Sequence, residues 1–435
     1  MKITILKQKS IGYAICMIGL AGCISSDNGI ETPDTGILSE LTIKLAFPAV
    51  EHLRAGGDPN ATEKEVKIET ANVFIYTPQG FCESQTAIQG EWKDGVYVST
   101  QIPAATGEKK IFVGVNLPSP LVDKLKNGMS NELTQVPQTL TVNDLVTANA
   151  LAMTSPLIAC EVKKQASENV LTVPIKRLTA KITVEKSPSL ETGGAAGKTE
   201  NIVFAVANFN QRSFLIQPDD KHDPNWSGAA FNPNEFLPRY DETNDAAYSF
   251  VPINEANISQ ITAYNALYAS ENTSELHRKK EITRVLVRAV FTPDSIVVKE
   301  GTRFVNKHAT ALGITSPVDF WLIAVPRPEN ELLFFTTYSI AVDYATTNAI
   351  PVNDANIVKY TGGKCYWDMF LNKNNSWDVQ RNDYHQCVIN RIMAPGRALP
   401  SVPDPDNPPP ADTEIDANIT VTPWTVIADE YNLVP

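Results

Sequence analysis

The chain has 435 residues, of which 43% are hydrophobic and 20% are charged, and its formal net charge is −12. This length leaves room for two domains of ordinary size, each with a core of its own. The acidic balance argues against nucleic acid as a partner, because phosphate binding needs a concentrated basic face. Proline, threonine, valine and isoleucine are frequent and long helical patterns are few, which indicates an all-β fold.

The first 23 residues have the features of an export signal. Three lysines precede an apolar run, Ile11–Leu20, that is too short to span a membrane as a helix. The run leads into LAGC at residues 20–23, which resembles the lipobox of bacterial lipoproteins. We expect residues 1–22 to be a signal peptide and Cys23 to carry the lipid that anchors the precursor. The alternative is a chance cysteine after an ordinary signal peptide.

A strand and an exposed loop come next. The strand LTIKLAF has one apolar face, made of Leu41, Ile43, Leu45 and Phe47. Residues 48–60 then carry the proline, glycine and asparagine of a loop. Arg54 lies in this loop, before Ala55, and no other arginine precedes Arg177. Such a loop is an easy site for proteolysis, although a solvated loop charge is the simpler interpretation of Arg54.

Strand patterns recur along the rest of the chain. They cover Val66–Tyr76, Lys110–Val115, Val170–Pro174, Arg177–Val184, Ile202–Phe209, Ile282–Phe291, Ser295–Lys299, Asp319–Val325, Tyr338–Tyr344 and Val379–Ile392. Short helices are predicted over Ser119–Gly128 and near Asn143–Ala152. We place a domain boundary near residue 174, which gives an N-terminal domain over residues 55–174 and a C-terminal domain over residues 175–399.

The last segment, residues 400–435, combines a proline-rich acidic leash with one further strand. The leash PSVPDPDNPPP cannot join a sheet and favours extended polyproline II, so it could hold the strand roughly 30 Å from the body. One face of the strand is apolar and consists of Ile415, Ala417, Ile419 and Val421. After Pro423 the apolar positions shift by one residue, to Trp424 and Val426, which suggests a bulge or bend. This strand either pairs with another molecule or returns to its own sheet.

Chemistry that would indicate an enzyme is missing from the sequence. The histidines show no metal-ligand spacing, there is no GxSxG elbow, and the TGGK sequence at residues 361–364 lacks the other positions of a phosphate-binding loop. We therefore expect no catalytic residue, no metal and no cofactor. Cys82, Cys160, Cys365 and Cys387 allow three disulfide pairings, and free buried thiols are also possible.

Five features, occurring in this order along the chain, give it a sequence that resembles the fimbrillins, the subunits of type V pili of Bacteroidetes. They are LAGC with the strand and arginine loop after it, RLTAKITV at residues 177–184, YASEN at 268–272 before TRVLVRAVFTP, VQRNDYHQCVINRI at 379–392, and the leash with ITVTPWTV. The resemblance implies two transthyretin-like β-sandwich domains stacked end to end, with a few short helices and a C-terminal extension strand. It also implies a lipid-anchored precursor in the outer membrane that becomes part of an extracellular, adhesive fimbrium.

The same resemblance implies how such subunits assemble. An arginine-specific protease, similar to the gingipains, would cut between Arg54 and Ala55 and remove the lipidated propeptide, residues 23–54. The groove left by strand 41–47 would then accept the strand around Ile415–Val426 of another copy or of a related subunit. Whether the subunit belongs to the shaft or is accessory stays open.

A monomeric glycan-binding lipoprotein is the alternative function. It would keep its N-terminal strand and present exposed aromatic residues to a sugar, the candidates being Trp226, Trp367 and Trp377. Packing in the core is the simpler interpretation of each of these tryptophans.

Overall fold

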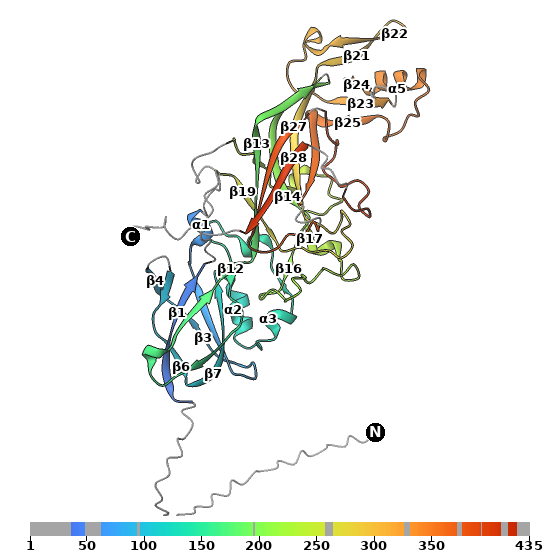
Figure 1. Ribbon diagram of the computed structural model, residues 1–435. Coiled ribbons are helices and arrows are strands. Elements are labelled where there is room, and N and C mark those ends of the chain that lie inside the picture. The colour runs from blue at the N-terminus through green and yellow to red at the C-terminus, as the bar shows by residue number, and fades with distance from the viewer. Residues whose placement is uncertain are drawn as a thin grey trace, which may run out of the picture.

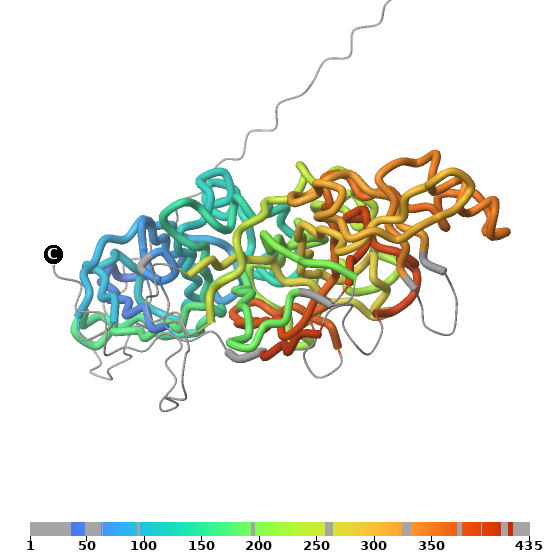
Figure 2. The backbone as a smooth tube through the Cα atoms, turned by 90° about the horizontal axis from the view of Figure 1, so that it is seen from above, coloured from blue at the N-terminus to red at the C-terminus, as the bar shows by residue number. Residues whose placement is uncertain are grey.

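The computed structural model describes residues 36–47, 62–93, 96–194, 196–256, 264–325, 331–371, 376–392, 394–409 and 416–423. The molecule is elongated, with an N-terminal β domain, a C-terminal β domain and a smaller unit at the far end (Figures 1 and 2). Most elements are strands and the helices are short, which confirms the predicted all-β class.

Two sheets make up the N-terminal domain. The first has the order β11-β1-β5-β4, with β6 also on β1; its strands are β1 (Leu38–Ala46), β4 (Gly90–Lys93), β5 (Val96–Ser99), β6 (Ile102–Ala105) and β11 (Val170–Pro174). The second has the order β12-β9-β7-β2-β3, with β10 on β7; its strands are β2 (Ala71–Tyr76), β3 (Cys82–Ala87), β7 (Gly107–Val115), β9 (Met153–Thr154), β10 (Ile158–Val162) and β12 (Lys176–Arg177). Apolar side chains from both sheets share one core, so the domain is a β-sandwich.

Short helices cover the outer face of the second sheet. They are α2 (Ser119–Leu125), α3 (Glu132–Gln135) and α4 (Val142–Leu145), while α1 (Glu63–Val66) lies before β2. Strand β2 is buried on both faces, because Val73 and Ile75 face the sandwich core while Phe74 and Tyr76 pack with the helices. The predicted helices are therefore present as α2 and α4, the second of them shorter than expected.

The C-terminal domain contains a sheet with the order β26-β20-β14-β13-β27-β28. Its strands are β13 (Thr179–Gly194), β14 (Gly197–Ala207), β20 (Arg284–Pro293), β26 (Lys364–Phe370), β27 (Asp383–Ile392) and β28 (Asp416–Pro423), with β18 (Val251–Pro252) on β14 and β19 (Ala266–Ser270) on β13. Strands β13 and β14 join only near their hairpin end, at Gly193–Lys198. Side chains from β13 and β27 share one core with those from β14, β20 and β26, so the two halves of the sheet pack on each other.

A smaller unit lies between β20 and β26 in sequence and at the far end of the molecule in space (Figure 1). It contains β21 (Ser295–Glu300), β22 (Arg303–His308), β23 (Phe320–Val325), β24 (Glu331–Phe335), α5 (Tyr338–Thr347) and β25 (Val358–Tyr360). The prediction of a strand over Tyr338–Tyr344 is wrong, because this segment lies in helix α5. Ala341 and Ala345 are four residues apart, and both are fully buried against the unit's own small core. The other predicted strands overlap strands of the structure.

The two large domains interlock where the chain passes between them. Strand β16 (Arg212–Ser213), from the C-terminal part of the chain, pairs with β8 (Gln138–Thr139), and β15 (Phe209–Asn210) pairs with β17 (Phe236–Leu237). Leu215 follows β16 and is fully buried among the side chains under the N-terminal helices. The domains therefore share part of a core.

Candidate functional site

Strand β1 is held on both sides within the first sheet. It runs parallel to β11 from Thr42 to Ala46, and antiparallel to β6 and then β5 on its other side. Side chains add to these main-chain bonds, since Ser99 Oγ accepts from the Ile43 backbone N–H at 2.9 Å. Asn169 Nδ2 donates to Ser39 Oγ at 3.1 Å and to the Glu40 carbonyl at 3.0 Å. Removing β1 would therefore separate β11 from β5 and β6.

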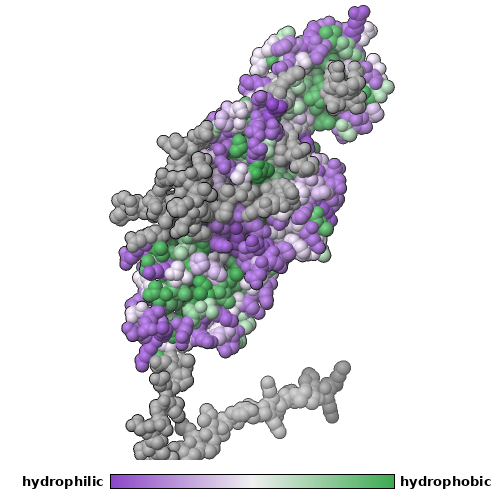
Figure 3. All heavy atoms as spheres, in the orientation of Figure 1, coloured by the Kyte–Doolittle hydropathy of each residue, from purple (hydrophilic) through white to green (hydrophobic). Residues whose placement is uncertain are grey.

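The apolar face of β1 is the middle of the N-terminal core. Leu41 is 2% exposed and both Ile43 and Leu45 are 0% exposed, so the predicted alternation is present with these three side chains inside. Phe47 follows the strand, is half-buried and stacks on Trp92 with ring centroids 5.6 Å apart. Hydrophobic residues also gather on the outside of this part of the domain (Figure 3), and Ile37 and Leu38 at the start of β1 are exposed.

A buried charge cluster lies at the domain junction, just beyond the predicted processing loop. Glu65 of α1 is 0% exposed, and its carboxylate pairs with Lys181 Nζ of β13 at 3.0 Å. The same carboxylate accepts from Tyr268 Oη at 2.7 Å. Arg177, 1% exposed, donates from Nε to the Glu65 carbonyl and from a terminal nitrogen to Asn382. This cluster fixes α1 to both domains.

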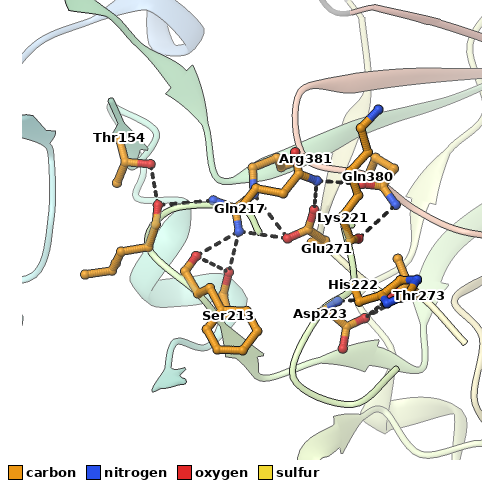
Figure 4. Close-up of polar contacts among 12 residues, drawn as sticks. Thr154, Ser213, Gln217, Lys221, His222, Asp223, Glu271, Thr273, Gln380 and Arg381 are labelled. Atoms are coloured by element: carbon orange, nitrogen blue, oxygen red, sulfur yellow. Dashed lines mark hydrogen bonds and ion pairs between the residues drawn. The ribbon is translucent and has the colours of Figure 1, made fainter. Parts of the chain in front are cut away.

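A second buried ion pair lies at the same junction between the domains. Arg381 and Glu271 form an ion pair with an N–O distance of 2.7 Å, and the Arg381 guanidinium also donates to the carbonyls of Phe214 and Leu215 (Figure 4). Gln217 connects this pair to Gln380. The Arg-Asn sequence at 381–382 thus holds the interlocking segment against the C-terminal domain. From the sequence, Arg381 and Asn382 are recognisable only as part of the family resemblance, which does not predict this structural role.

Strand β28 occupies the edge of the C-terminal sheet. It pairs antiparallel with β27, with Ile419 opposite Cys387 and Ala417 opposite Ile389. Ala417 and Ile419 are half-buried and pack on the core, while Asp416, Asn418 and Thr420 are exposed. The predicted alternation is therefore present on these residues. In contrast to β1, this strand has a sheet neighbour on one side only.

The leash does not stand away from the body over the residues that the structure describes. The Val402 backbone N–H donates to the Tyr240 carbonyl, and Val402 is buried. The backbone N–H groups of Lys279 and Lys280 donate to the carbonyls of Asn407 and Pro405, and Lys280 Nζ pairs with Asp406. The expectation that the leash extends roughly 30 Å away from the body is thus wrong for residues 400–409. The basic turn at 277–280 is the clamp that holds it.

Several predicted site residues lie outside the described part of the chain. These are Cys23, Arg54, Ala55, Ile415, Trp424 and Val426. Val421 is within β28, where it lies opposite His385. The roles of Cys23 and Arg54, and the transfer of the extension strand, therefore stay predictions.

The remaining candidates divide by burial. Trp367 is 4% exposed and belongs to the C-terminal core, whereas Trp226 and Trp377 are half-buried. All four described cysteines are free thiols, so none of the three disulfide pairings that the sequence allows is formed. Burial raises the pKa of Cys365 and of Cys387 to about 12.

Two further properties concern the described residues alone. No helix among them is long and apolar enough to cross a membrane. Within the same residues, no three histidine, cysteine, aspartate or glutamate side chains are grouped so that they could bind a metal ion.

Comparison with known proteins points to one family. Residues 39–217 match the family model of the major fimbrial subunit protein FimA of Porphyromonas gingivalis, and residues 358–430 match that of the C-terminal part of fimbrillin, the major fimbrial subunit protein type IV. The two matches together span more than half of the chain, and they include β1 and β28. A search of curated proteins found no match.

Solved structures agree on the fold. A fimbrilin (FimA) from Porphyromonas gingivalis is similar at a TM-score of 0.51 and 14% identity, over 89% of this chain and 99% of that one. A candidate cell adhesion protein from Parabacteroides distasonis is similar at a TM-score of 0.51 and 13% identity, over 89% of this chain and 100% of that one. The chain therefore belongs to the fimbrillin family and is a structural subunit of a cell-surface fimbria.

Proposed function

We propose that the subunit is made as a lipid-anchored precursor and polymerises head-to-tail by donor-strand exchange after proteolysis. The observation that carries this proposal is the contrast between two strands of similar pattern. Strand β1 fills the middle of one core and is joined directly to the segment that contains Arg54, whereas β28 lies half-buried on a sheet edge. A strand held on one side can leave its place at lower cost than one held on both sides.

The position of Arg54 suits a single processing step by an arginine-specific protease. It is the only arginine before Arg177, which is 1% exposed and therefore protected in the folded chain. A cut between Arg54 and Ala55 separates β1 from the rest of the subunit. The new N-terminal segment stays attached, because Glu65 is tied to Lys181 and Tyr268 at the junction. The mature subunit then begins at Ala55 with the propeptide strand detached from the chain.

Exchange replaces one alternating strand by another. The groove left by β1 is lined by the side chains that bury Leu41, Ile43 and Leu45, and β28 presents Ala417 and Ile419 at the same period of two. Burying four or five apolar side chains contributes roughly 6–15 kcal/mol before the cost of ordering the strand. The acceptor groove and the donor strand belong to different domains, so the contact is heterologous and extends into a filament.

The membrane step precedes assembly. Acylation at Cys23 would hold the precursor at the outer membrane, and cleavage after Arg54 would release the subunit from that anchor. Partners are other copies or related fimbrial subunits, and the assembled fimbria supports adhesion to another surface.

The monomeric glycan-binding lipoprotein is supported by one observation. Strand β28 is paired with β27 of its own domain, which is the arrangement expected of a chain that does not donate its strand. An edge position is equally expected of a strand stored before exchange. The two functions differ in whether β28 leaves β27 after β1 has been removed.

The deciding experiment uses two substitutions on opposite faces of β28. In a chain that begins at Ala55, we expect Ile419→Asp to abolish the ladder of polymers on unboiled gels, because it places a charge on the face that enters the groove. The matched control Thr420→Asp changes an exposed position of the same strand and should leave the ladder intact. A ladder that survives both Ile419→Asp and deletion of residues 415–435 would exclude exchange of this strand.

Processing is tested on the full precursor with Arg54→Lys. Lysine preserves the charge and the loop but resists an arginine-specific protease, so we expect an anchored monomer that retains its N-terminal lipid. Polymer at the normal yield would contradict the cleavage step.

A further inference from the structure

Three loops of the C-terminal domain converge on one surface that the assembly strands do not use. The Glu275 backbone N–H donates to the Trp226 carbonyl at 2.9 Å, and the Ser274 backbone N–H donates to Asp378 Oδ1 at 3.2 Å. Gln380 Nε2 reaches the Lys221 carbonyl at 3.4 Å. The segments around residues 221–226, 274–277 and 377–380 therefore form one surface, and none of them belongs to β1 or β28.

This surface carries two histidine–tryptophan pairs. His222 stacks on Trp226 with centroids 3.8 Å apart and an interplanar angle of 7°. His277 lies against Trp377 with centroids 5.5 Å apart at 58°. Both tryptophans are half-buried, and the His222 side chain is 37% exposed. Large aromatic rings thus remain partly open to solvent instead of joining the core, as Trp367 does.

Strained backbone concentrates at the same place. Lys221, His277 and Trp377 have φ angles of 60°, 51° and 52°, and they are three of the nine non-glycine residues with positive φ in the described part of the chain. This conformation is unusual for a bulky residue such as tryptophan. Residues held in such conformations cluster at functional sites, where the strain is tolerated because it fixes the position of a side chain.

Polar groups surround the rings. Asp378 is half-buried, and burial raises its pKa, while the hydrogen bond from the Ser274 backbone N–H and then the nearby His277 and His222 oppose this rise. Asp220 pairs with His222, and the carboxylate of Glu275 and the amide of Gln380 belong to the same loops. Aromatic faces beside carboxylate and amide groups match a saccharide ring, which has apolar C–H faces and hydroxyls around its edge.

We propose that Trp226, Trp377 and Asp378 form a binding site for neutral saccharides. The two tryptophans would contact the faces of sugar rings, and the Asp378 carboxylate would accept from a sugar hydroxyl. Proline-rich peptides also bind aromatic surfaces, but proline has no backbone N–H, so such a peptide offers a carboxylate fewer donors than a sugar with hydroxyls around its ring. The site gives a fimbrial subunit an adhesive contact that does not depend on strand exchange.

The test measures saccharide binding by the purified full-length chain in detergent. An array of neutral oligosaccharides built from glucose, galactose, mannose and N-acetylglucosamine identifies the best ligand, which is then titrated by calorimetry. We expect Trp377→Gly to weaken binding at least tenfold without lowering the unfolding midpoint, because glycine relieves the positive φ while the ring is lost. Trp226→Ala and Asp378→Asn should also weaken binding.

Two controls separate the site from a purely structural role. Lys221→Gly relieves strain in the same cluster without removing a ring, and Trp321→Ala removes a half-buried tryptophan of the distal unit; both should bind as the unchanged chain does. The proposal is overturned if no neutral oligosaccharide binds, or if Trp377→Gly and Trp226→Ala bind normally. Binding of the peptide PSVPDPDNPPP in place of any sugar would also overturn it.

Discussion

At the scale of single residues, the most consequential feature is the buried ion pair between Glu65 and Lys181. Both side chains are at most 1% exposed, and the carboxylate is further hydrogen bonded to Tyr268. Burying two charges gains little net stability, but removing one partner leaves the other charge without compensation. We therefore infer that the pair matters mainly for specifying how α1 is attached to the C-terminal domain.

We predict that Glu65→Gln lowers the free energy of unfolding by about 3–5 kcal/mol, because the Lys181 ammonium loses its buried partner. Urea denaturation followed by circular dichroism measures this change. The double variant Glu65→Gln/Lys181→Met should recover more than half of the loss. As a control, Asp123→Asn breaks an exposed pair with Lys126 and should have no measurable effect. Equal effects at the two sites would show that the Glu65 pair is not buried in solution.

The thiols give a second prediction at this scale. Burial raises the pKa of all four described cysteines, most strongly for Cys365 and Cys387. Since the thiolate is the reactive form, a native chain starting at Ile24 should react with Ellman's reagent at pH 8 slowly at Cys82 and Cys160 and not at the other two. All four should react in guanidinium chloride. A native chain with fewer than four thiols after unfolding would instead contain a disulfide.

At the scale of elements, the sequence predicts those features that depend on local patterns. The alternation of Leu41, Ile43 and Leu45 is sufficient to predict β1 and its buried face, and the alternation of Ala417 and Ile419 does the same for β28. The pattern does not predict the partner of either strand. Pairing depends on contacts between residues far apart in sequence, such as Thr42 with Val170.

Two segments show where local patterns mislead. Ile340, Val342 and Tyr344 alternate as in a strand, but Ala341 and Ala345 are small enough to pack a helix closely on β23 and β24, and this packing decides the outcome. The leash has the composition of an extended linker, but the backbones of Lys279 and Lys280 offer N–H donors to its carbonyls. In both cases the deciding partner is remote in sequence.

The clamp on the leash leads to a prediction about local order. Replacing Lys279 and Lys280 together by glutamate should increase hydrogen exchange and proteolysis within residues 400–409, because the new charges repel Asp404 and Asp406. The free energy of unfolding should change by no more than about 1 kcal/mol, since ion pairs at the surface contribute little. Lys299→Glu/Lys307→Glu, on the distal hairpin, serves as the control with the same charge change. Unchanged exchange in the leash would mean that its backbone contacts alone hold it.

At the scale of the whole molecule, the two large domains behave as one mechanical unit. The segment 208–217 crosses from the C-terminal domain into the N-terminal one, where the Ile216 backbone N–H donates to the Leu133 carbonyl and the Gln211 carbonyl accepts from Leu140. The Arg381–Glu271 pair (Figure 4) lies at this junction, and so does the Glu65–Lys181 pair. A filament of such subunits should therefore bend between subunits more readily than within them.

The interlock also predicts how the molecule unfolds. Leu215 is fully buried in the N-terminal domain although the segment that carries it continues into the C-terminal one. Leu215→Ala leaves a cavity, so we expect a loss of about 2–5 kcal/mol that appears in both domains. Hydrogen exchange of β2 and of β20 reports on each domain, and both should lose protection together. Leu333→Ala, in the separate core of the distal unit, should lower protection in β23 and β24 and leave β2 unchanged. If Leu215→Ala affected β2 alone, the two domains would be independent units joined only by chain.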